Sequence, residues 1–237
     1  MAYNFIITQQ EYNTVLQARK MLLQQYEANE YDCQQCKEMF PSSSKMEDVE
    51  KKVKLLNSYY STRVEVQPMV DNIVRLAKSK DLENRIMEGD LSVIQDIAQT
   101  NRINFSFATK YCSLLQPDKF PIYDSYVWKF FYKLKELGFF SDATSKKITK
   151  QFRKNYCDYV DIYNEFIDKS GISSFYRNYR EVDAFIWGAC EMYLLLNKKS
   201  KFTNKKYYKD LFDDLFPTLL ANLLSTAIWE ILKLIFL

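Results

Sequence analysis

Apolar residues recur every three or four positions along most of this chain, the spacing that places them on one face of an α-helix. Between residues 46 and 60, for example, apolar side chains stand at positions 49, 53, 55, 56, 59 and 60. No stretch shows the strict alternation of apolar and polar residues that is typical of a half-buried strand. We therefore predict an all-α fold, a multi-helix domain.

Capping residues, prolines and glycines set the predicted helix boundaries. Thr8 or Asn13 opens a first helix that runs toward Tyr31. Ser44 precedes Glu47 by three residues, which is the spacing of a capping box. Further helices are predicted after Pro68, after Asp90 as the cap, over residues 105–116, over 125–137 up to Gly138, and over about 145–154, 158–169 and 173–196.

Residues 103–131, "INFSFATKYCSLLQPDKFPIYDSYVWKFF", carry the most informative pattern. The helix capped by Asp90 ends near Gln99, and another begins four or five residues later, so the two form a helical hairpin. The free N–H groups at the start of the second helix are a typical binding site for phosphate. Lys110 lies about one turn into that helix, surrounded by apolar or small residues.

Asp124 follows Lys110 by fourteen residues and directly precedes an apolar helix pattern. Pro117 and Pro121 hold the connection extended and stiff. The dipole of the following helix stabilises the ionised form of Asp124. From the residues alone two interpretations stay open. The pair is either a solvated lysine and a helix cap, or an amine nucleophile and the carboxylate that assists it.

The chain of 237 residues contains no histidine, and this absence restricts its chemistry. It excludes serine–histidine and cysteine–histidine nucleophiles, histidine-bound zinc and the usual general base near neutral pH. Five cysteines, an odd number, and an N-terminus without a signal-peptide pattern indicate reduced thiols and a cytoplasmic protein. Cys33 and Cys36 have the spacing of half a metal knuckle but lack a second pair, so we predict no metal and no cofactor.

The C-terminal part differs in composition from the rest. Residues 1–197 form the predicted helical domain, with its main motifs between 90 and 190, and residues 198–210 form a basic linker. Residues 211–237 form an apolar C-terminal helix. Glu230 and Lys233 make it a poor membrane span, so we favour a core helix or a homo-oligomer interface. An interfacial membrane helix and a partner-binding helix stay open as alternatives.

The hairpin and its following aspartate resemble the helix-hairpin-helix DNA glycosylase superfamily, which includes endonuclease III and the 8-oxoguanine glycosylases. The family hairpin reads Leu-Pro-Gly-Val-Gly-x-Lys-x-Ala, and its second motif reads Asp-x-His-Val-x-Arg. In this chain Ser106 and Ala108 stand at the glycines, Lys110 at the catalytic lysine, Cys112 at the alanine, Asp124 at the catalytic aspartate, and Tyr126, Val127 and Lys129 after it. The similarity is greatest to bacterial 8-oxoguanine-glycosylase-like proteins, whose later Arg-x-x-Asp-x-x-x-Trp corresponds here to "REVDAFIW".

The resemblance implies a mechanism. A nucleotide is flipped out of the duplex, Lys110 attacks C1′ of its sugar to form a Schiff base, and Asp124 assists. The implied DNA contacts come from the hairpin, from the helix after Asp124 and from a later run of cations. The run of cations is either a phosphate-contacting face or a solvated helix. The candidate DNA-binding residues are Ser106, Ala108, Thr109, Lys129, Lys146, Lys147 and Lys150. The aromatic residues Tyr111, Tyr123 and Tyr126 are candidates for a base pocket. Asp183 and Trp187 are interpreted as a buried or half-buried structural pair.

Two rival functions stay open beside the glycosylase/lyase with DNA as its partner. One is a helical module that binds nucleic acid or protein without chemistry, with phage defence as one setting. The other is a helical protein that is tethered or oligomerised through residues 211–237.

Overall fold

In the computed structural model, residues 6–25, 45–60, 62–100, 103–150 and 155–196 are described. These residues are helical apart from their connections and one isolated β-bridge between Gln99 and Ile103, which confirms the all-α prediction. In chain order the helices are α1 (Gln9–Gln25), α3 (Met46–Tyr60), α4 (Val66–Lys80), α5 (Leu82–Glu88), α6 (Val93–Ala98), α7 (Phe105–Leu115), α8 (Ser125–Glu136), α9 (Asp142–Lys147), α10 (Tyr156–Lys169), the 3₁₀ helix η1 (Ile172–Ser174) and α11 (Tyr179–Leu196).

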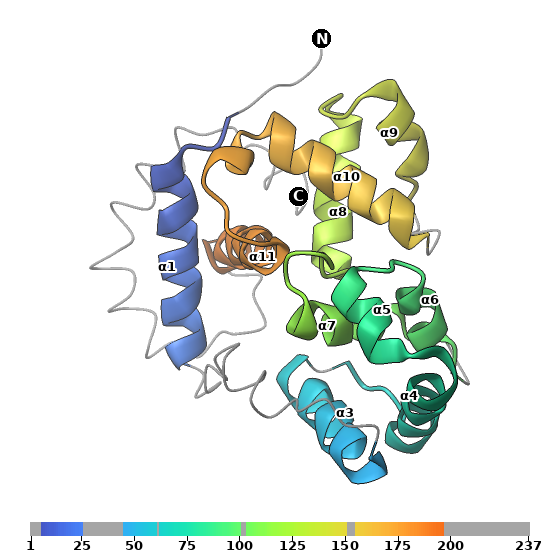
Figure 1. The fold of residues 1–237 in the computed structure, drawn as a ribbon. Helices are drawn as coiled ribbons and strands as arrows, with labels where there is room; N and C mark the ends of the chain where they lie inside the picture. Colours follow the sequence, from blue (N-terminus) through green and yellow to red (C-terminus); the bar gives the residue numbers. More distant parts are fainter. Residues whose placement is uncertain (1–5, 26–44, 61, 101–102, 151–154, 197–237) are drawn as a thin grey trace.

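The helices form two groups that share one hydrophobic core (Figure 1). Helices α3 to α7 pack against one another, with α4 against α3, α5 and α6, and α7 against α3, α5 and α6. In the second group, α11 packs against α1 and α8, while α10 packs against α9 and η1. The chain passes from the first group to the second through residues 116–124, so this connection lies at the seam between the groups.

Several predicted helix ends are confirmed by their caps. Thr8 and Glu11 form a capping box before α1, in which the Glu11 N–H donates to Thr8 Oγ1 at 3.3 Å and the Thr8 N–H donates to the Glu11 carboxylate at 2.7 Å. Asp124 caps α8 by accepting from the N–H of Tyr126 at 2.7 Å. Gly138 follows that helix with a φ of 73°, the left-handed conformation that glycine adopts most easily.

Other boundaries differ from the prediction. Helix α4 begins at Val66, because Pro68 falls in its first turn, where the missing N–H costs nothing. The short helix α5 was not predicted. Helix α9 covers Asp142–Lys147 rather than 145–154, since Ser141 caps it early by accepting from the N–H of Thr144. Helix α11 begins at Tyr179 rather than near 173, where η1 stands instead.

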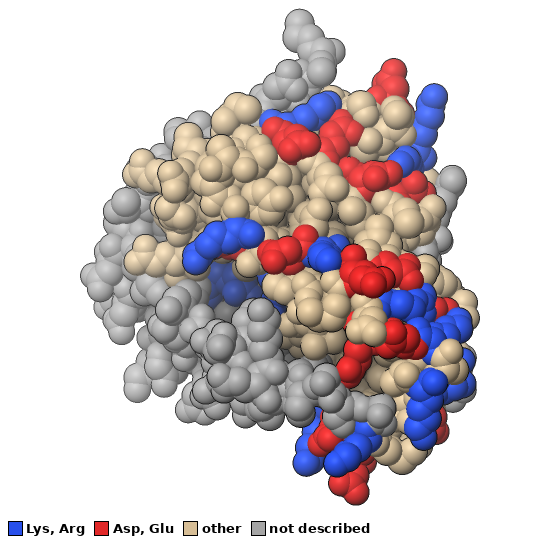
Figure 2. Space-filling model, in the orientation of Figure 1, with Lys and Arg blue, Asp and Glu red and all other residues tan. Residues whose placement is uncertain are grey.

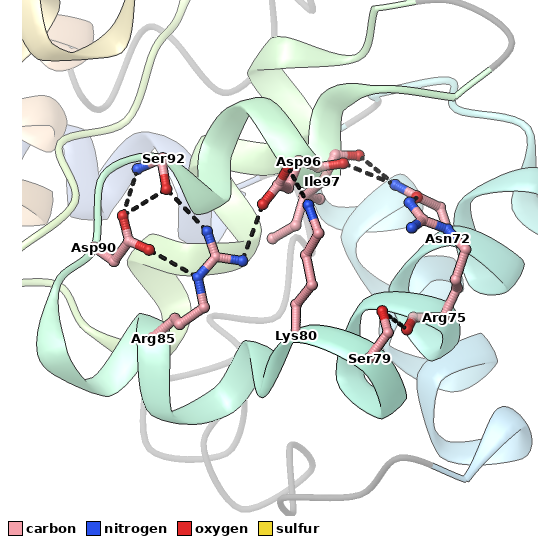
Figure 3. Close-up of polar contacts among 9 residues, drawn as sticks. All are labelled: Asn72, Arg75, Ser79, Lys80, Arg85, Asp90, Ser92, Asp96 and Ile97. Carbon is pink, nitrogen blue, oxygen red and sulfur yellow. Dashed lines mark hydrogen bonds and ion pairs between the residues drawn. The ribbon is translucent and has the colours of Figure 1, made fainter.

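We predicted that Asp90 caps α6, and this prediction is wrong. Asp90 instead holds the turn before that helix. Its Oδ1 accepts from the backbone N–H and the hydroxyl of Ser92 at 2.9 and 2.6 Å. The guanidinium of Arg85 joins that turn to α6, donating to Asp90 at 2.7 Å and to Asp96 at 2.9 Å (Figure 3). Lys80 donates to Asp96 from α4 at 3.1 Å. One arginine therefore connects α5, the turn and α6, the first helix of the hairpin.

The predicted elements that depend on residues 26–44, 198–210 and 211–237 lie outside the described residues; they include the Ser44 cap, the Cys33–Cys36 pair, the basic linker and the apolar C-terminal helix. Within the described ranges, no helix combines the length and the apolar character needed to cross a bilayer.

The Arg85 network predicts an acid-sensitive contribution to stability. Hydrogen bonds from Ser92 and Arg85 hold the pKa of Asp90 below its usual value. Burial raises the pKa of Asp96, but the hydrogen bonds from Arg85 and Lys80 outweigh burial and hold that pKa below its usual value. We expect Arg85→Met to lower the free energy of unfolding at pH 7 by about 1–2 kcal/mol. Because the folded pKa values are depressed, this loss should shrink as the pH falls below about 4.

Urea denaturation at pH 7 and pH 3 measures the effect of Arg85→Met. Lys133→Met is the control, since its exposed pair with Glu136 on α8 should contribute less than about 0.5 kcal/mol at either pH. An equal loss for the two variants at pH 7 would contradict a special role for Arg85.

Candidate active site

A tight turn joins α6 to α7 and brings Lys110 to the seam between the two helix groups. The N–H of Asn104 donates to the carbonyl of Ala98 at 3.0 Å, and Ile103 pairs with Gln99 across the turn. Helices α6 and α7 pack against each other, so the predicted helical hairpin is present. Ser106 lies in the first turn of α7, and Lys110 follows it by four residues on the same face.

The side chain of Lys110 is buried, with only 5% of the residue exposed. Its Nζ donates a hydrogen bond to Ser106 Oγ at 3.1 Å. The same Nζ lies 3.9 Å from Oδ2 of Asp124 and 4.9 Å from the ring centroid of Tyr60. The interpretation of Lys110 as a solvated surface lysine is therefore wrong, because the ammonium points inward at defined partners.

Asp124 acts as a helix cap and as a charge partner at once. Its Oδ1 accepts from the N–H of Tyr126 while its Oδ2 faces Lys110. The cap fixes the carboxylate at the start of α8, where the helix dipole also favours negative charge. The two interpretations that the sequence left open are thus compatible for this residue.

Hydrogen bonds from both helix groups fix the connection that carries Asp124. From the first group, Thr109 Oγ1 on α7 accepts from the N–H of Tyr123 at 3.1 Å. From the second group, the hydroxyls of Tyr156 and Tyr159 on α10 donate to the carbonyls of Pro121 and Ile122 at 2.7 and 2.6 Å. Because Thr109 directly precedes Lys110 and Tyr123 directly precedes Asp124, the first of these bonds sets the two functional groups side by side.

The start of this connection is fixed as well. Lys119 Nζ donates to the carbonyl of Met87 at the end of α5 at 2.6 Å. The N–H of Tyr179, at the start of α11, donates to the carbonyl of Pro117 at 3.2 Å. The fourteen residues from Lys110 to Asp124 are thus long enough to bring the two side chains together.

A second acid belongs to the electrostatic environment of Lys110. Asp183 on α11 is half-buried, but its Oδ1 is closed off from solvent and has no hydrogen-bond partner within the described residues. Burial, reinforced by the charge of Asp124, raises the pKa of Asp183 to about 7, although Arg19, Lys110 and Arg180 pull it down. Burial lowers the pKa of Lys110, while Asp124 and Asp183 oppose that shift.

Asp183 and Trp187, which the sequence predicted to be a structural pair, have different surroundings. The guanidinium of Arg19 on α1 lies 5.4 Å from the ring of Trp187. Asp183 instead interacts electrostatically with Lys110, and its charge also raises the pKa values of the buried Tyr159 and Tyr163. We therefore assign Asp183 to the candidate site.

The residues predicted to contact DNA have different degrees of exposure. The side chains of Ala108 and Thr109 are buried in α7, so they offer no surface for a phosphate. Ser106 is half-buried and is bound to Lys110. Lys129, Lys146 and Lys150 are exposed, whereas Lys147 pairs with Asp158 and Asp161 of α10; those four lysines lie on α8, on α9 or just after it.

Charges of both signs alternate on the face shown in Figure 2, and its described residues form no continuous basic patch. The chain after α9 returns to the first turn of α8, because Trp128 Nε1 donates to the carbonyl of Thr149 at 3.1 Å. Lys129 lies over the ring of Tyr126 at 5.8 Å, on the first turns of the same helix.

The three tyrosines predicted for a base pocket are also placed differently. Tyr111 is buried in the core, where it stacks against Phe107, and burial raises its pKa. Tyr123 and Tyr126 are half-buried beside Asp124. Tyr123 packs edge-on against Phe105 and Tyr159 with centroids 5.5 and 5.6 Å apart, whereas Lys129 lies over the ring of Tyr126.

Sequence reasoning missed two residues of the site, Tyr60 and the site role of Asp183. The contact between Ser106 and Lys110 was not predicted either, although their spacing of four residues on one helix is compatible with it. Asp183 gave a weaker signal, since it interrupts an apolar run in α11 that includes Val182, Phe185 and Ile186. Tyr60 gave none, because it stands fifty residues before Lys110 in an aromatic-rich chain.

Comparisons with known proteins give two matches. A family model described as "HI_0787_N: N-terminal domain" matches residues 8–119, a range that includes Lys110 and ends before Asp124. A protein of Haemophilus influenzae described as "Uncharacterized protein" is 30% identical over 149 residues, which cover 60% of this chain and 66% of that relative. The chain thus spans just under two thirds of the relative's length. No solved structure matches the chain.

The hydrogen bonds from Tyr156 and Tyr159 to the connection before Asp124 predict a stability effect for Tyr159→Phe. Removing the hydroxyl leaves the buried carbonyl of Ile122 without that donor, so we expect the free energy of unfolding to fall by about 1–2 kcal/mol. The control is Tyr176→Phe, because the Tyr176 hydroxyl makes no hydrogen bond within the described residues. Urea unfolding should show a change below about 0.5 kcal/mol for the control. An equal loss of stability in Tyr159→Phe and Tyr176→Phe would argue against a stabilising role for the Tyr159 hydrogen bond.

The raised pKa of Asp183 predicts that its ionisation destabilises the fold. A folded pKa above the unfolded value contributes stability at low pH that is lost as the pH rises through about 7. Asp183→Asn, which mimics the neutral acid, should match the wild type at pH 4 and exceed it by about 1–3 kcal/mol at pH 8. Urea unfolding across this range measures the difference. A difference that does not vary with pH would rule out a titrating Asp183, and Asp142→Asn on exposed α9 serves as the control.

Proposed function

We propose that this protein is a DNA glycosylase/AP-lyase-like enzyme that removes a damaged or modified base. The observation that carries the proposal is the distance of 3.9 Å between Nζ of the buried Lys110 and Oδ2 of Asp124. The resemblance to the helix-hairpin-helix glycosylases assigns these two residues the catalytic roles. The cytoplasmic location that reduced thiols indicate is compatible with a DNA substrate.

In the proposed reaction, the amine of Lys110 forms a bond to C1′ of the flipped nucleotide as the bond from C1′ to the base breaks. The departing base takes up a proton. The sugar ring then opens to a Schiff base between Nζ and C1′. Asp124, held at the start of α8, stabilises the positive charge that develops on the sugar during departure of the base.

The environment of Lys110 supports its assignment as the nucleophile. An amine attacks only in its neutral form, and burial lowers the pKa of Lys110 toward the range in which that form is populated. The hydrogen bond to Ser106 and the proximity of Asp124 fix the direction of the side chain. A surface lysine would meet neither condition.

The rival proposal, a helical module that binds nucleic acid or protein without chemistry, draws on the charges of the surface. The net charge is only +3, and Lys147 is neutralised by two aspartates. Such a surface supplies limited phosphate neutralisation. The rival therefore depends on shape and hydrogen bonding, and the experiment below separates the two proposals.

The proposed function predicts a covalent adduct that depends on Lys110. The full chain is incubated with duplexes that contain an abasic site or 8-oxoguanine, in the presence of sodium borohydride, and analysed by denaturing electrophoresis. We expect an adduct for the wild type and a loss of about 100-fold or more for Lys110→Gln. Asp124→Asn should slow base excision by about 10²–10³-fold while still trapping the abasic duplex.

Two controls sharpen this test. Lys133→Gln removes a half-buried lysine of α8 that pairs with Glu136, and it should leave the adduct unchanged. Duplex binding is measured in parallel by fluorescence anisotropy. An adduct that persists in Lys110→Gln would disprove the assignment of the nucleophile, and wild-type binding without an adduct on either duplex would favour the binding module.

A further inference from the structure

Tyr60, the last residue of α3, brings an aromatic ring to the ammonium of Lys110. The Nζ atom lies 4.9 Å from the ring centroid. From the second helix group, Nη2 of Arg180 on α11 donates to the Tyr60 hydroxyl at 3.3 Å. Tyr60 therefore connects the two helix groups at the site, with one cation at its ring and another at its hydroxyl.

The burial of Lys110 makes this ring important for the charge on Nζ. A cation that is removed from water interacts more strongly with the negative face of an aromatic ring than one at an exposed site. The other contacts of Nζ are a neutral hydroxyl at 3.1 Å and a carboxylate oxygen at 3.9 Å. The second of these is too long for a hydrogen bond, so the ring is a substantial part of the stabilisation.

We propose that the Tyr60 ring is part of the reaction site, where it stabilises the positive charge on Nζ of Lys110, first as the ammonium and then as the protonated Schiff base. The second stage rests on the proposed function. The first depends only on the position of the ring.

The chemistry places a positive charge on Nζ again after the neutral amine has reacted. The neutral amine adds to an aldehyde carbon, and the resulting carbinolamine takes up a proton and loses water. This leaves a carbon–nitrogen double bond with the charge on Nζ. Hydride from borohydride then adds to the imine carbon. Because Nζ donates to Ser106 and lies near Asp124, we expect the ring to face this atom both before and after the bond forms.

Other charged groups also face Nζ and must be held constant in a test. They are Asp124 before α8 and Asp183 on α11, and Arg180 and Arg19 act on Asp183 in turn. A change at Tyr60 keeps all four groups in the chain, but every variant that lacks the hydroxyl loses the hydrogen bond from Arg180. Tyr60→Phe keeps the ring and removes the bond to Arg180, whereas Tyr60→Leu keeps most of the bulk and removes the ring.

The test is the pH dependence of Lys110 modification in the full chain, with formaldehyde as the probe and cyanoborohydride as the reductant. Mass spectrometry of the peptide that contains Lys110 gives the rate at each pH. For Tyr60→Leu we expect the midpoint to fall by roughly 0.5–1 unit relative to the wild type, because the ammonium loses its aromatic partner. For Tyr60→Phe we expect a midpoint within about 0.2 unit of the wild type.

A substitution that preserves shape guards against misfolding of the leucine variant. Tyr60→pentafluorophenylalanine keeps the size of the ring but reverses its quadrupole, so its midpoint should fall below that of Tyr60→Phe. Unchanged midpoints in both ring-altering variants, or an equal fall in Tyr60→Phe, overturn the proposal for Tyr60.

Failure of the proposed function has a different signature. A midpoint shift without any DNA adduct in the wild type would leave Tyr60 as the partner of the ammonium and remove the glycosylase. A DNA adduct without a midpoint shift would support the glycosylase and remove Tyr60 as the partner of the ammonium.

Discussion

The hydrogen bond from the Tyr123 N–H to Thr109 Oγ1 joins the two halves of the site. Each of these residues directly precedes a functional one, Lys110 on α7 and Asp124 before α8. The bond therefore transmits the position of α7 to the start of α8. Tyr156 and Tyr159 hold the same stretch from the opposite side through Pro121 and Ile122. With the connection fixed from both helix groups, the amine and the carboxylate are held 3.9 Å apart.

This arrangement explains how a buried lysine is tolerated. Burial disfavours its charged form, and the neighbouring carboxylates and the Tyr60 ring favour it. These opposing effects leave the amine closer to neutrality than a surface lysine while keeping its direction fixed. The pKa of Asp183 shifts in the opposite direction to that of Lys110, since burial and the carboxylate of Asp124 both raise it. The pKa of Lys110 is lowered and that of Asp183 is raised to about 7, so the difference between the two pKa values is smaller than for exposed groups. The charge state of the site is therefore sensitive to pH near neutrality.

Local signals predicted the parts of the fold that depend on neighbours in the chain. The helix start at Thr8, the Asp124 cap and Gly138 were recognisable because each acts within about four residues of itself. Asp90 was predicted to cap α6 but holds the turn before that helix, where it binds Arg85. Arg85 lies in α5, a helix that the sequence pattern did not reveal. Tyr60 could not be predicted at all, since its contact with Lys110 depends on how α3 packs against α7.

Ser106 and Ala108, which the resemblance aligns with glycines, show how the hairpin of this chain forms without glycine. Ser106 and Ala108 lie within α7 itself, where no left-handed backbone is required. Ala108 is buried because a small side chain is needed where α7 packs into the core. Ser106 has gained a different role, since its hydroxyl accepts the hydrogen bond from Lys110, which a glycine cannot do. The lysine is thus oriented from within its own helix, the carboxylate is set by the connection, and the ring of Tyr60 comes from α3, so three separate elements define the position of a single nitrogen atom.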